Sequence, residues 1–229
     1  MAASSAVGSF DKADMDLWLQ MPGTWVEAPN LRRGGESGVQ RVSTSEHQLY
    51  YRKQQVEHLY YDWCHPFGYP TAMREYNALL QARKLGVRVP RVVYAGCRKQ
   101  NKRWLALLVT EALHGYTSLE DCYAQGEHER WGEPLHCEIL RRYGSSLARL
   151  NAGRWQHGCL YLKHVFIRVD RRGIDIALID MEKARQRISA KRAARHDLRQ
   201  VKRRSSWTES QWQAFLQGYR SVFPTAVPE

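Results

Sequence analysis

The chain has 229 residues and a mass of 26.7 kDa, which suits one large domain or two small lobes. Hydrophobic residues make up 43% and charged residues 25%, proportions that exclude a disordered, collagen-like or membrane-embedded protein. The 35 Lys and Arg exceed the 23 Asp and Glu, and the resulting formal net charge of +12 favours anionic partners.

The sequence shows neither a membrane span nor a secretory signal. The longest unbroken apolar run, Trp104 to Val109, has six residues, whereas a spanning helix needs about 20. Residues 1–8 lack the basic and apolar regions of a signal peptide. The five cysteines are scattered and form no C-x-x-C pair, which argues against a disulfide framework or a zinc knuckle. We therefore expect a cytoplasmic location.

The segment 25–54 predicts a β-hairpin in which short strands surround a glycine-rich turn at residues 33–38. The predicted strands are Trp25–Val26, Val39–Val42 and Leu49–Tyr51.

A helix is predicted at Thr71–Leu85, because apolar residues recur there at helical spacing and Gly86 is placed to end it. Two strands are predicted next, at Val87–Tyr94 and Trp104–Val109, joined by a basic turn at Arg98–Arg103. These elements predict a small α+β lobe with one main helix.

Helical periodicity dominates after a connector at Leu113–Tyr116, so we expect an N-lobe of residues 1–112 and a C-lobe of residues 113–229. A further hairpin is predicted from the apolar segments Val165–Val169 and Ile174–Ile179.

Near the C-terminus, Ser206 to Glu209 has the pattern of a capping box that begins a helix. The predicted apolar face of this helix consists of Trp212, Phe215, Leu216, Tyr219 and Phe223.

The glycine-rich turn is a candidate phosphate-binding element. Backbone amides at Gly34, Gly35 and Gly38 lack side-chain bulk and can approach phosphate oxygens. Glycines are also common in ordinary hairpins, and taken alone the pattern favours that simpler interpretation. It is not a Walker A loop, which needs Gly-Lys-Ser/Thr at the start of a helix.

A strand cation and a helix carboxylate follow the turn. Arg52 and Lys53 are adjacent on a predicted strand, and Glu75 lies on the predicted helix. A strand cation held by a helix carboxylate fixes the α- and β-phosphates in kinase-like enzymes. Neighbours on a strand face opposite sides, so only one of the two cations can take this role. Surface charges on a hairpin and an amphipathic helix are the alternative.

The loop at residues 156–167 contains His157, Cys159 and His164, and the hairpin that follows ends at Asp180. An acidic residue that closes an apolar strand opposite a His-rich loop is where a kinase fold places its metal-binding Asp.

Taken together, these motifs resemble the lipopolysaccharide core kinases of the Kdo/WaaP family, and most closely its InaA branch. The matching segments are residues 32–39, 66–75, 107–111, 157–164, 180–183 and 196–200.

The resemblance implies a two-lobed, α+β protein-kinase-like fold with a β-rich N-lobe and a mainly helical C-lobe. It implies ATP and Mg²⁺ as cofactors and phosphoryl transfer to a sugar hydroxyl of lipopolysaccharide core or a related anionic glycolipid. The residues placed around the nucleotide are Gly34, Gly35, Ser37, Gly38, Arg52, Lys53, Glu75, Glu111 and Leu113. The residues placed at the reaction are His157, Cys159, His164 and Asp180, with Asp180 and His164 at the metal.

Three positions depart from the family's pattern. Cys159 stands where active members have the catalytic-loop Asp, and His164 stands where kinase-like loops usually have Asn. Arg52 aligns with the expected lysine and leaves Lys53 beside it. A thiol reproduces a carboxylate poorly, so a regulatory pseudokinase is the alternative function. Covalent catalysis by Cys159 would require a lowered thiol pKa.

Two further roles follow from the resemblance and from charge. Asp197 resembles the residue that braces the catalytic loop, and His157 resembles a packing residue. The segment Lys183 to Arg204 holds ten Lys and Arg against one Asp. This charge suits a solvated face, a dock for anionic lipopolysaccharide core at the inner membrane surface, or a nucleic-acid surface. The segment contains no Phe, Tyr or Trp, which disfavours nucleic acid. No oligomeric state is predicted.

Overall fold

A computed structural model describes residues 12–26, 28–32, 34–44 and 46–226. The predicted absence of a signal peptide concerns residues 1–8, and one residue of the predicted turn is Arg33; both lie outside the described residues. The chain divides into two compact units. The first comprises Met1–Tyr76 and Arg91–Ala112, and the second comprises Asn77–Pro90 and Leu113–Glu229.

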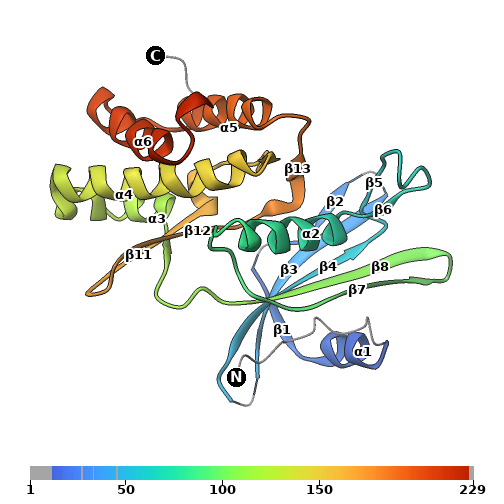
Figure 1. The fold of residues 1–229 in the computed structure, drawn as a ribbon. Coiled ribbons are helices and arrows are strands. Elements are labelled where there is room, and N and C mark those ends of the chain that lie inside the picture. The colour runs from blue at the N-terminus through green and yellow to red at the C-terminus, as the bar shows by residue number, and fades with distance from the viewer. Residues whose placement is uncertain (1–11, 27, 33, 45, 227–229) are drawn as a thin grey trace, which may run out of the picture. The chain divides into compact units, whose positions relative to one another are not determined.

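The first unit is built on an antiparallel sheet with strand order β1-β3-β4-β8-β7, with β2 paired to β3 (Figure 1). The sheet strands are β1 Gly23–Trp25, β2 Asn30–Arg32, β3 Gly35–Ser43, β4 Leu49–Val56, β7 Val92–Gln100 and β8 Arg103–Glu111. The other elements are α1 Lys12–Gln20, β5 Leu59–Tyr60, β6 Tyr69–Pro70 and α2 Thr71–Lys84, which continues into the second unit.

One face of this sheet packs against α1. Met15 of α1 is buried in a core with Tyr94, Leu105, Leu107 and Val109, and alternate residues of β8 reach the core because strand side chains alternate between faces. The side chains between these positions on β8 point to the opposite face of the sheet.

The predicted helix at 71–85 is confirmed as α2, but the predicted limits of the neighbouring strands are wrong. β7 begins at Val92 rather than Val87, because Pro90 has no amide proton and Arg88 instead bridges to Ala177 of β12. The turn between β7 and β8 is Asn101-Lys102, two residues with positive φ of 51° and 64°, a conformation typical of tight hairpins. The predicted basic turn at Arg98–Arg103 is therefore mostly strand.

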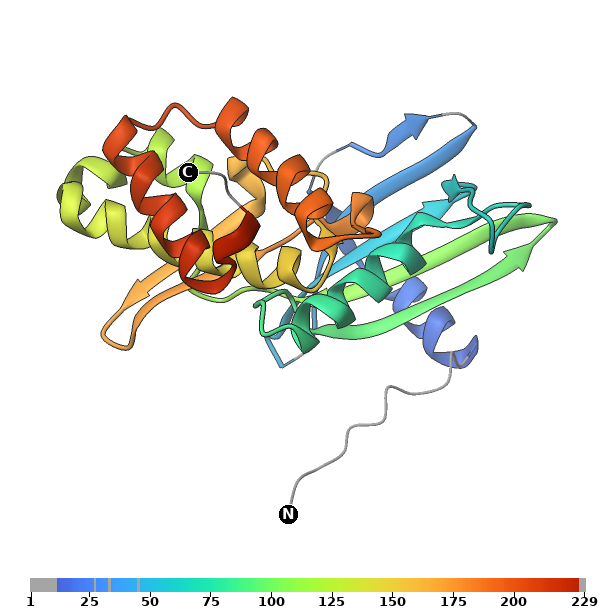
Figure 2. The ribbon, with the colours of Figure 1, turned by 45° about the horizontal axis from the view of Figure 1, so that its top comes forward.

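The second unit is mainly helical (Figure 2). Its helices are α3 Leu119–Ala124, α4 Glu127–Ala152, α5 Ala190–Arg204 and α6 Glu209–Val222, with 3₁₀ turns η1 Leu162–His164, η2 Met181–Lys183 and η3 Pro224–Ala226. Its short strands are β9 Thr117–Ser118, β10 Trp155–Gln156, β11 Val165–Asp170, β12 Gly173–Leu178 and β13 Arg185–Gln186. The predicted hairpin is confirmed as β11 and β12.

The α4 and α6 helices pack side by side through an aromatic core. Tyr143 of α4 and Phe215 of α6 are fully buried, with ring centroids 5.1 Å apart in an edge-to-face arrangement. Tyr219 of α6 is also fully buried, and its hydroxyl donates to the Asn151 side chain at 2.8 Å. The predicted apolar face of the last helix is thus the face that packs on α4.

Among the residues that the structure describes, no helix combines the length and the apolar content needed to cross a membrane.

The capping box of α6 lies two residues later than predicted. Thr208, rather than Ser206, caps the helix: its side chain accepts from the Gln211 amide, and the Gln211 side chain accepts from the Thr208 amide at 3.1 Å. Ser206 and Thr208 both fit a capping pattern. Thr208 is the cap because it immediately precedes Glu209, the first residue of the helix.

The Thr208→Ala substitution is expected to lower the free energy of unfolding by about 1 kcal/mol, because it leaves an amide of the first turn unpaired. The exposed Ser206→Ala substitution serves as the control and is expected to change it by less than about 0.5 kcal/mol. Urea denaturation measures both values. Equal losses for the two variants would contradict the assigned cap.

Candidate functional site

In the first unit, Lys53 of β4 forms an ion pair with Glu75 of α2. The Lys53 Nζ lies 2.5 Å from the Glu75 Oε2, and the two side chains are only 15% and 7% exposed. Burial strengthens such a pair, because water screens the two charges less than at the surface. The pair fixes a lysine ammonium on the face of the sheet next to α2.

Arg52 lies on the other face of β4, toward α1. Its guanidinium donates to the backbone carbonyls of Trp18 and Met21, the latter at 2.9 Å, and to the Gln40 side chain. Burial lowers the pKa of Arg52. The sequence left the choice between the two cations open; in the structure Lys53 pairs with Glu75, and Arg52 anchors α1 to the sheet.

Gln55 is a residue that sequence reasoning missed. It lies two positions after Lys53, on the same face of β4, and is almost fully buried. Its Oε1 accepts from the Thr71 hydroxyl at 2.9 Å and the Ala72 amide at 2.8 Å, and its Nε2 donates to Ser37 Oγ at 3.1 Å. One amide side chain therefore joins the first turn of α2 to β3.

The predicted glycine turn is mostly strand, because β3 begins at Gly35 rather than at the predicted Val39. A Cβ at Gly35 would overlap the backbone of Glu57, and a Cβ at Gly38 would overlap the ring of Trp25. These two buried glycines therefore permit close packing within the unit. Gly34 differs, because it is exposed and has a φ of 77°, which favours glycine.

Glu111, predicted on the adenine side, forms an ion pair with Arg91 at the end of β8. The Arg91 Nε donates to the Glu111 Oε2 at 2.7 Å, and this hydrogen bond raises the pKa of Arg91. Leu113 belongs to the second unit, is half-buried, and its carbonyl accepts from the Tyr116 amide at 3.3 Å.

In the second unit, Asp197 of α5 holds the loop that follows β10. This fully buried carboxylate accepts from the amides of His157 at 2.8 Å and Gly158 at 3.2 Å, and from the Asn151 side chain at 2.8 Å. The predicted bracing role of Asp197 is confirmed.

Two further residues of α5 hold the same loop and were not identified from the sequence. Gln200 accepts from the Leu160 amide at 3.0 Å and donates to the Gly158 carbonyl at 3.1 Å. Arg204 donates to the Leu160 carbonyl at 3.0 Å and lies over the Tyr161 ring. Asp197, Gln200 and Arg204 share one face of α5 at helical spacing, a signal that the sequence contains.

His157 is fully buried in the loop after β10. Its Nε2 lies 3.0 Å from the carbonyl of Ile179, which can only accept, so Nε2 carries the proton. Its Nδ1 then accepts from the Cys159 amide at 3.3 Å. Burial lowers the pKa of His157, consistent with a neutral ring that packs and orients the loop.

His164, Cys159 and Asp180 lie together at the end of β12. The His164 Nδ1 lies 2.7 Å from the Cys159 carbonyl, and its Nε2 lies 3.5 Å from the Asp180 Oδ2. Asp180 has a positive φ of 56°, an uncommon conformation that often marks functional sites.

The Cys159 thiol is poorly suited to nucleophilic chemistry. Burial, and then the charge of Asp180, raises its pKa to about 11, so the thiol stays protonated at neutral pH. A lowered pKa, which covalent catalysis through phosphocysteine would need, is the opposite of what this environment produces.

The carboxylates of Asp180 and Glu182 approach each other within 4.8 Å. Two carboxylates at this spacing supply the oxygen ligands that Mg²⁺ prefers. The side chains of His164 and Cys159, which also lie near Asp180, suit Mg²⁺ less well than the two carboxylates, because nitrogen and sulfur are softer donors than oxygen.

The predicted basic segment becomes the exposed face of α5 and the residues before it. Its exposed cations are Lys183, Arg185, Lys191, Arg192, Arg195, Arg199, Lys202 and Arg203. Arg187 and Arg204 are exceptions within the segment, because both are half-buried: Arg187 donates to the Gln156 side chain and Arg204 to the Leu160 carbonyl.

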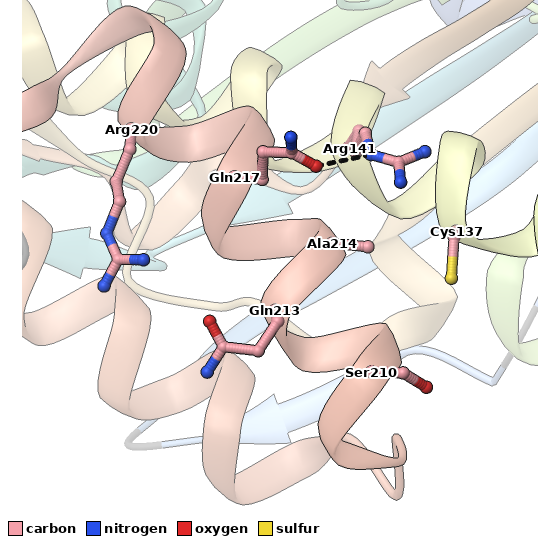
Figure 3. A pocket seen from close by; sticks show the side chains of 7 residues that line it. All are labelled: Cys137, Arg141, Ser210, Gln213, Ala214, Gln217 and Arg220. Carbon is pink, nitrogen blue, oxygen red and sulfur yellow. Dashed lines mark hydrogen bonds between the residues drawn. The ribbon is translucent and has the colours of Figure 1, made fainter.

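A pocket of about 510 Å³ lies between α4 and α6 (Figure 3). It is lined by Cys137, Arg141, Ser210, Gln213, Ala214, Gln217 and Arg220. None of these is a predicted site residue, and the Arg141 Nε donates to the Gln217 Oε1 across it at 2.8 Å.

Comparisons with known proteins identify the class of fold and the family. The chain matches WaaP in a solved structure of WaaP in complex with acyl carrier protein, with a TM-score of 0.66 at 17% identity. The match covers 91% of this chain and 82% of that one, and WaaP has a protein-kinase-like fold. This likeness confirms the predicted α+β, protein-kinase-like fold.

The sequence comparisons are more specific. The model of the lipopolysaccharide kinase (Kdo/WaaP) family matches residues 16–219, and the chain belongs to this family. Protein InaA of Escherichia coli (strain K12) is 33% identical over 203 residues, which cover 89% of this chain and 91% of that protein. The predicted family and its InaA branch are thereby confirmed, and membership supports a kinase-like function.

The Asp197→Asn substitution is expected to lower the free energy of unfolding by about 2–3 kcal/mol, because an amide nitrogen would face buried N–H donors. The exposed Glu120→Gln substitution makes the same chemical change and is expected to cost less than about 0.5 kcal/mol. Chemical denaturation compares the two variants. A neutral Asp197→Asn would show that the buried carboxylate does not hold the loop.

Proposed function

We propose that this chain is an ATP-dependent kinase that transfers a phosphoryl group to a sugar hydroxyl of lipopolysaccharide core or a related anionic glycolipid. The observation that carries the proposal is the buried Lys53–Glu75 ion pair. Kinase-fold enzymes use this pairing to hold a lysine against the α- and β-phosphates. Membership of the lipopolysaccharide kinase family supports both the reaction and the class of acceptor.

Several of the residues predicted around the nucleotide have a role in this proposal. Lys53 would neutralise phosphate charge, and Gly34, exposed at the turn between β2 and β3, would let backbone amides approach phosphate oxygens. Glu111 and Leu113 would lie on the adenine side. In the chemical step, positioning and electrostatic stabilisation outweigh proton abstraction, because the phosphoryl transition state is largely dissociative.

Asp180 and Glu182 are the residues that would hold Mg²⁺. Their carboxylates lie close enough to share one ion, and the donor set is the one that this hard cation prefers. When bound, Mg²⁺ would neutralise charge on the phosphates of ATP.

The exposed cations of α5 would attract an anionic acceptor. Lys191, Arg192, Arg195, Arg199 and Lys202 are all exposed on this helix, which suits the phosphate-rich surface of lipopolysaccharide core. A location in the cytoplasm with peripheral contact at the inner membrane surface follows from this proposal. Salt would weaken the contact, because surface charges are screened.

Calorimetric titration with a non-hydrolysable ATP analogue tests the nucleotide site. We expect binding that requires Mg²⁺ and is at least about ten-fold weaker in Asp180→Asn, a loss of about 1.4 kcal/mol, because a metal ligand is removed. Asp170→Asn, which removes an exposed carboxylate at the turn after β11, is expected to bind like the wild type.

Two results would contradict the proposed kinase. One is the absence of Mg²⁺-dependent binding in the wild type. The other is equal binding by wild type and Asp180→Asn, which would place the nucleotide elsewhere.

A regulatory pseudokinase is the second candidate function, and the state of Cys159 favours it. A protonated thiol whose pKa is raised to about 11 cannot accept a hydroxyl proton as a carboxylate does. In this alternative the fold binds nucleotide without turnover and acts through protein partners.

The Cys159→Asp substitution discriminates the two functions, because it restores a carboxylate where active family members have one. If the chain is a slow kinase, we expect ATP turnover, measured as phosphate release, to rise by about 10²-fold or more, the typical contribution of a general base. Cys64→Asp, which makes the same change at an exposed position, is the control and is expected to leave turnover unchanged. Unchanged turnover in a variant that still binds Mg·ATP would support the pseudokinase.

A further inference from the structure

We propose that Cys159 Sγ, His164 Nε2 and the Asp180 carboxylate form a site for a borderline-soft divalent metal ion, with Zn²⁺ as the best-fitting ion. The three residues lie in the second unit. The proposal therefore does not depend on nucleotide binding or on kinase activity.

The spacing of the ligand atoms fits a single metal ion. The candidate atoms of the three residues all lie within 4.8 Å of one another. Ligand atoms of a tetrahedral zinc site lie about 3.3–3.7 Å apart, given metal–ligand distances of about 2.0–2.3 Å. The 3.5 Å between the His164 Nε2 and the Asp180 Oδ2 matches this spacing. It is longer than a normal N–H···O hydrogen bond of about 2.7–3.2 Å.

The tautomer of His164 is fixed by the backbone. The Cys159 carbonyl lies 2.7 Å from the His164 Nδ1 and can only accept, so Nδ1 carries the ring proton. In the neutral ring, Nε2 then presents its lone pair toward Asp180. Metal-binding histidines are typically oriented in this way, with the second ring nitrogen donating to a carbonyl or carboxylate.

The chemistry of the donor set selects the kind of ion. Imidazole nitrogen and thiolate sulfur suit Zn²⁺ and related transition metals, whereas Mg²⁺ prefers oxygen. Binding replaces the Cys159 thiol proton, which leaves to solvent as the Sγ–metal bond forms. The metal would therefore supply the stabilisation that a buried thiolate otherwise lacks.

The site is prearranged and accessible on one side. Cys159 and His164 are only 5% and 8% exposed, whereas the Asp180 side chain is 31% exposed and leaves a path for the ion. Asp197 and Gln200 hold the backbone of the loop that carries Cys159. Three protein ligands leave a fourth position for water, as in zinc sites that are not closed.

Cobalt provides a direct test, because Co²⁺ occupies zinc sites and a thiolate ligand gives a ligand-to-metal charge-transfer band in the ultraviolet. Metal-stripped, nucleotide-free protein is titrated with Co²⁺, and Zn²⁺ is then added in competition. We expect a saturable band at one Co²⁺ per chain that Zn²⁺ removes and excess Mg²⁺ does not.

Variants assign the ligands. Cys159→Ser is expected to abolish the band. His164→Asn is expected to weaken Co²⁺ binding at least about ten-fold, because even the loss of an outer-shell partner of a metal site costs about that much. Cys122→Ser is the matched control, because Cys122 is also buried and burial likewise raises its pKa to about 11. It is expected to retain the full band, and circular dichroism confirms that each variant is folded.

The band would overturn the proposal if it persisted in folded Cys159→Ser, or if it were absent from the wild type. These outcomes are separate from the kinase test. A chain that binds Mg·ATP but gives no cobalt band would contradict the metal site alone, and a chain that gives the band but binds no nucleotide would contradict the kinase alone.

Discussion

The buried carboxylate of Asp197 is the interaction on which the loop after β10 in the second unit depends. A fully buried charge is costly unless it is paired or hydrogen-bonded, and the amides of His157 and Gly158 supply bonds together with Asn151. The carboxylate therefore fixes the backbone of the loop rather than a side chain. Because backbone groups hold the loop, the side chains that follow can vary without loss of its conformation.

The fixed backbone of this loop orients the residues of the candidate site through a series of contacts. The Cys159 amide donates to His157, and the Cys159 carbonyl accepts from His164, so one residue sets the orientation of two imidazoles. The His164 ring then faces Asp180, which follows β12 in a left-handed conformation. The Ile179 carbonyl therefore fixes the tautomer of His157, the Cys159 carbonyl fixes that of His164, and the backbone of Cys159 contacts both rings.

Much of the local structure could be predicted from the sequence, because helices and hairpins follow from apolar periodicity, and the role of Asp197 followed from the family resemblance. The sequence could not decide between candidate residues that are close neighbours in the chain. Ser206 and Thr208 both fit a cap, and the choice depends on where packing begins the helix. Arg52 and Lys53 alternate on one strand, and periodicity cannot say which face meets α1. Long-range packing decides both cases.

The departures from the family pattern at Cys159 and His164 are chemically matched. Together the two changes place a sulfur and a nitrogen donor beside the Asp180 carboxylate, where the family pattern has the oxygen-bearing side chains of Asp and Asn. Asp180 then belongs to two candidate donor sets, a hard one with Glu182 and a softer one with Cys159 and His164. An ion bound by one set would neutralise the charge of the Asp180 carboxylate, which is also a ligand of the other set. Binding at the two proposed sites would therefore be coupled, and the coupling would be reciprocal because it would act through one shared ligand.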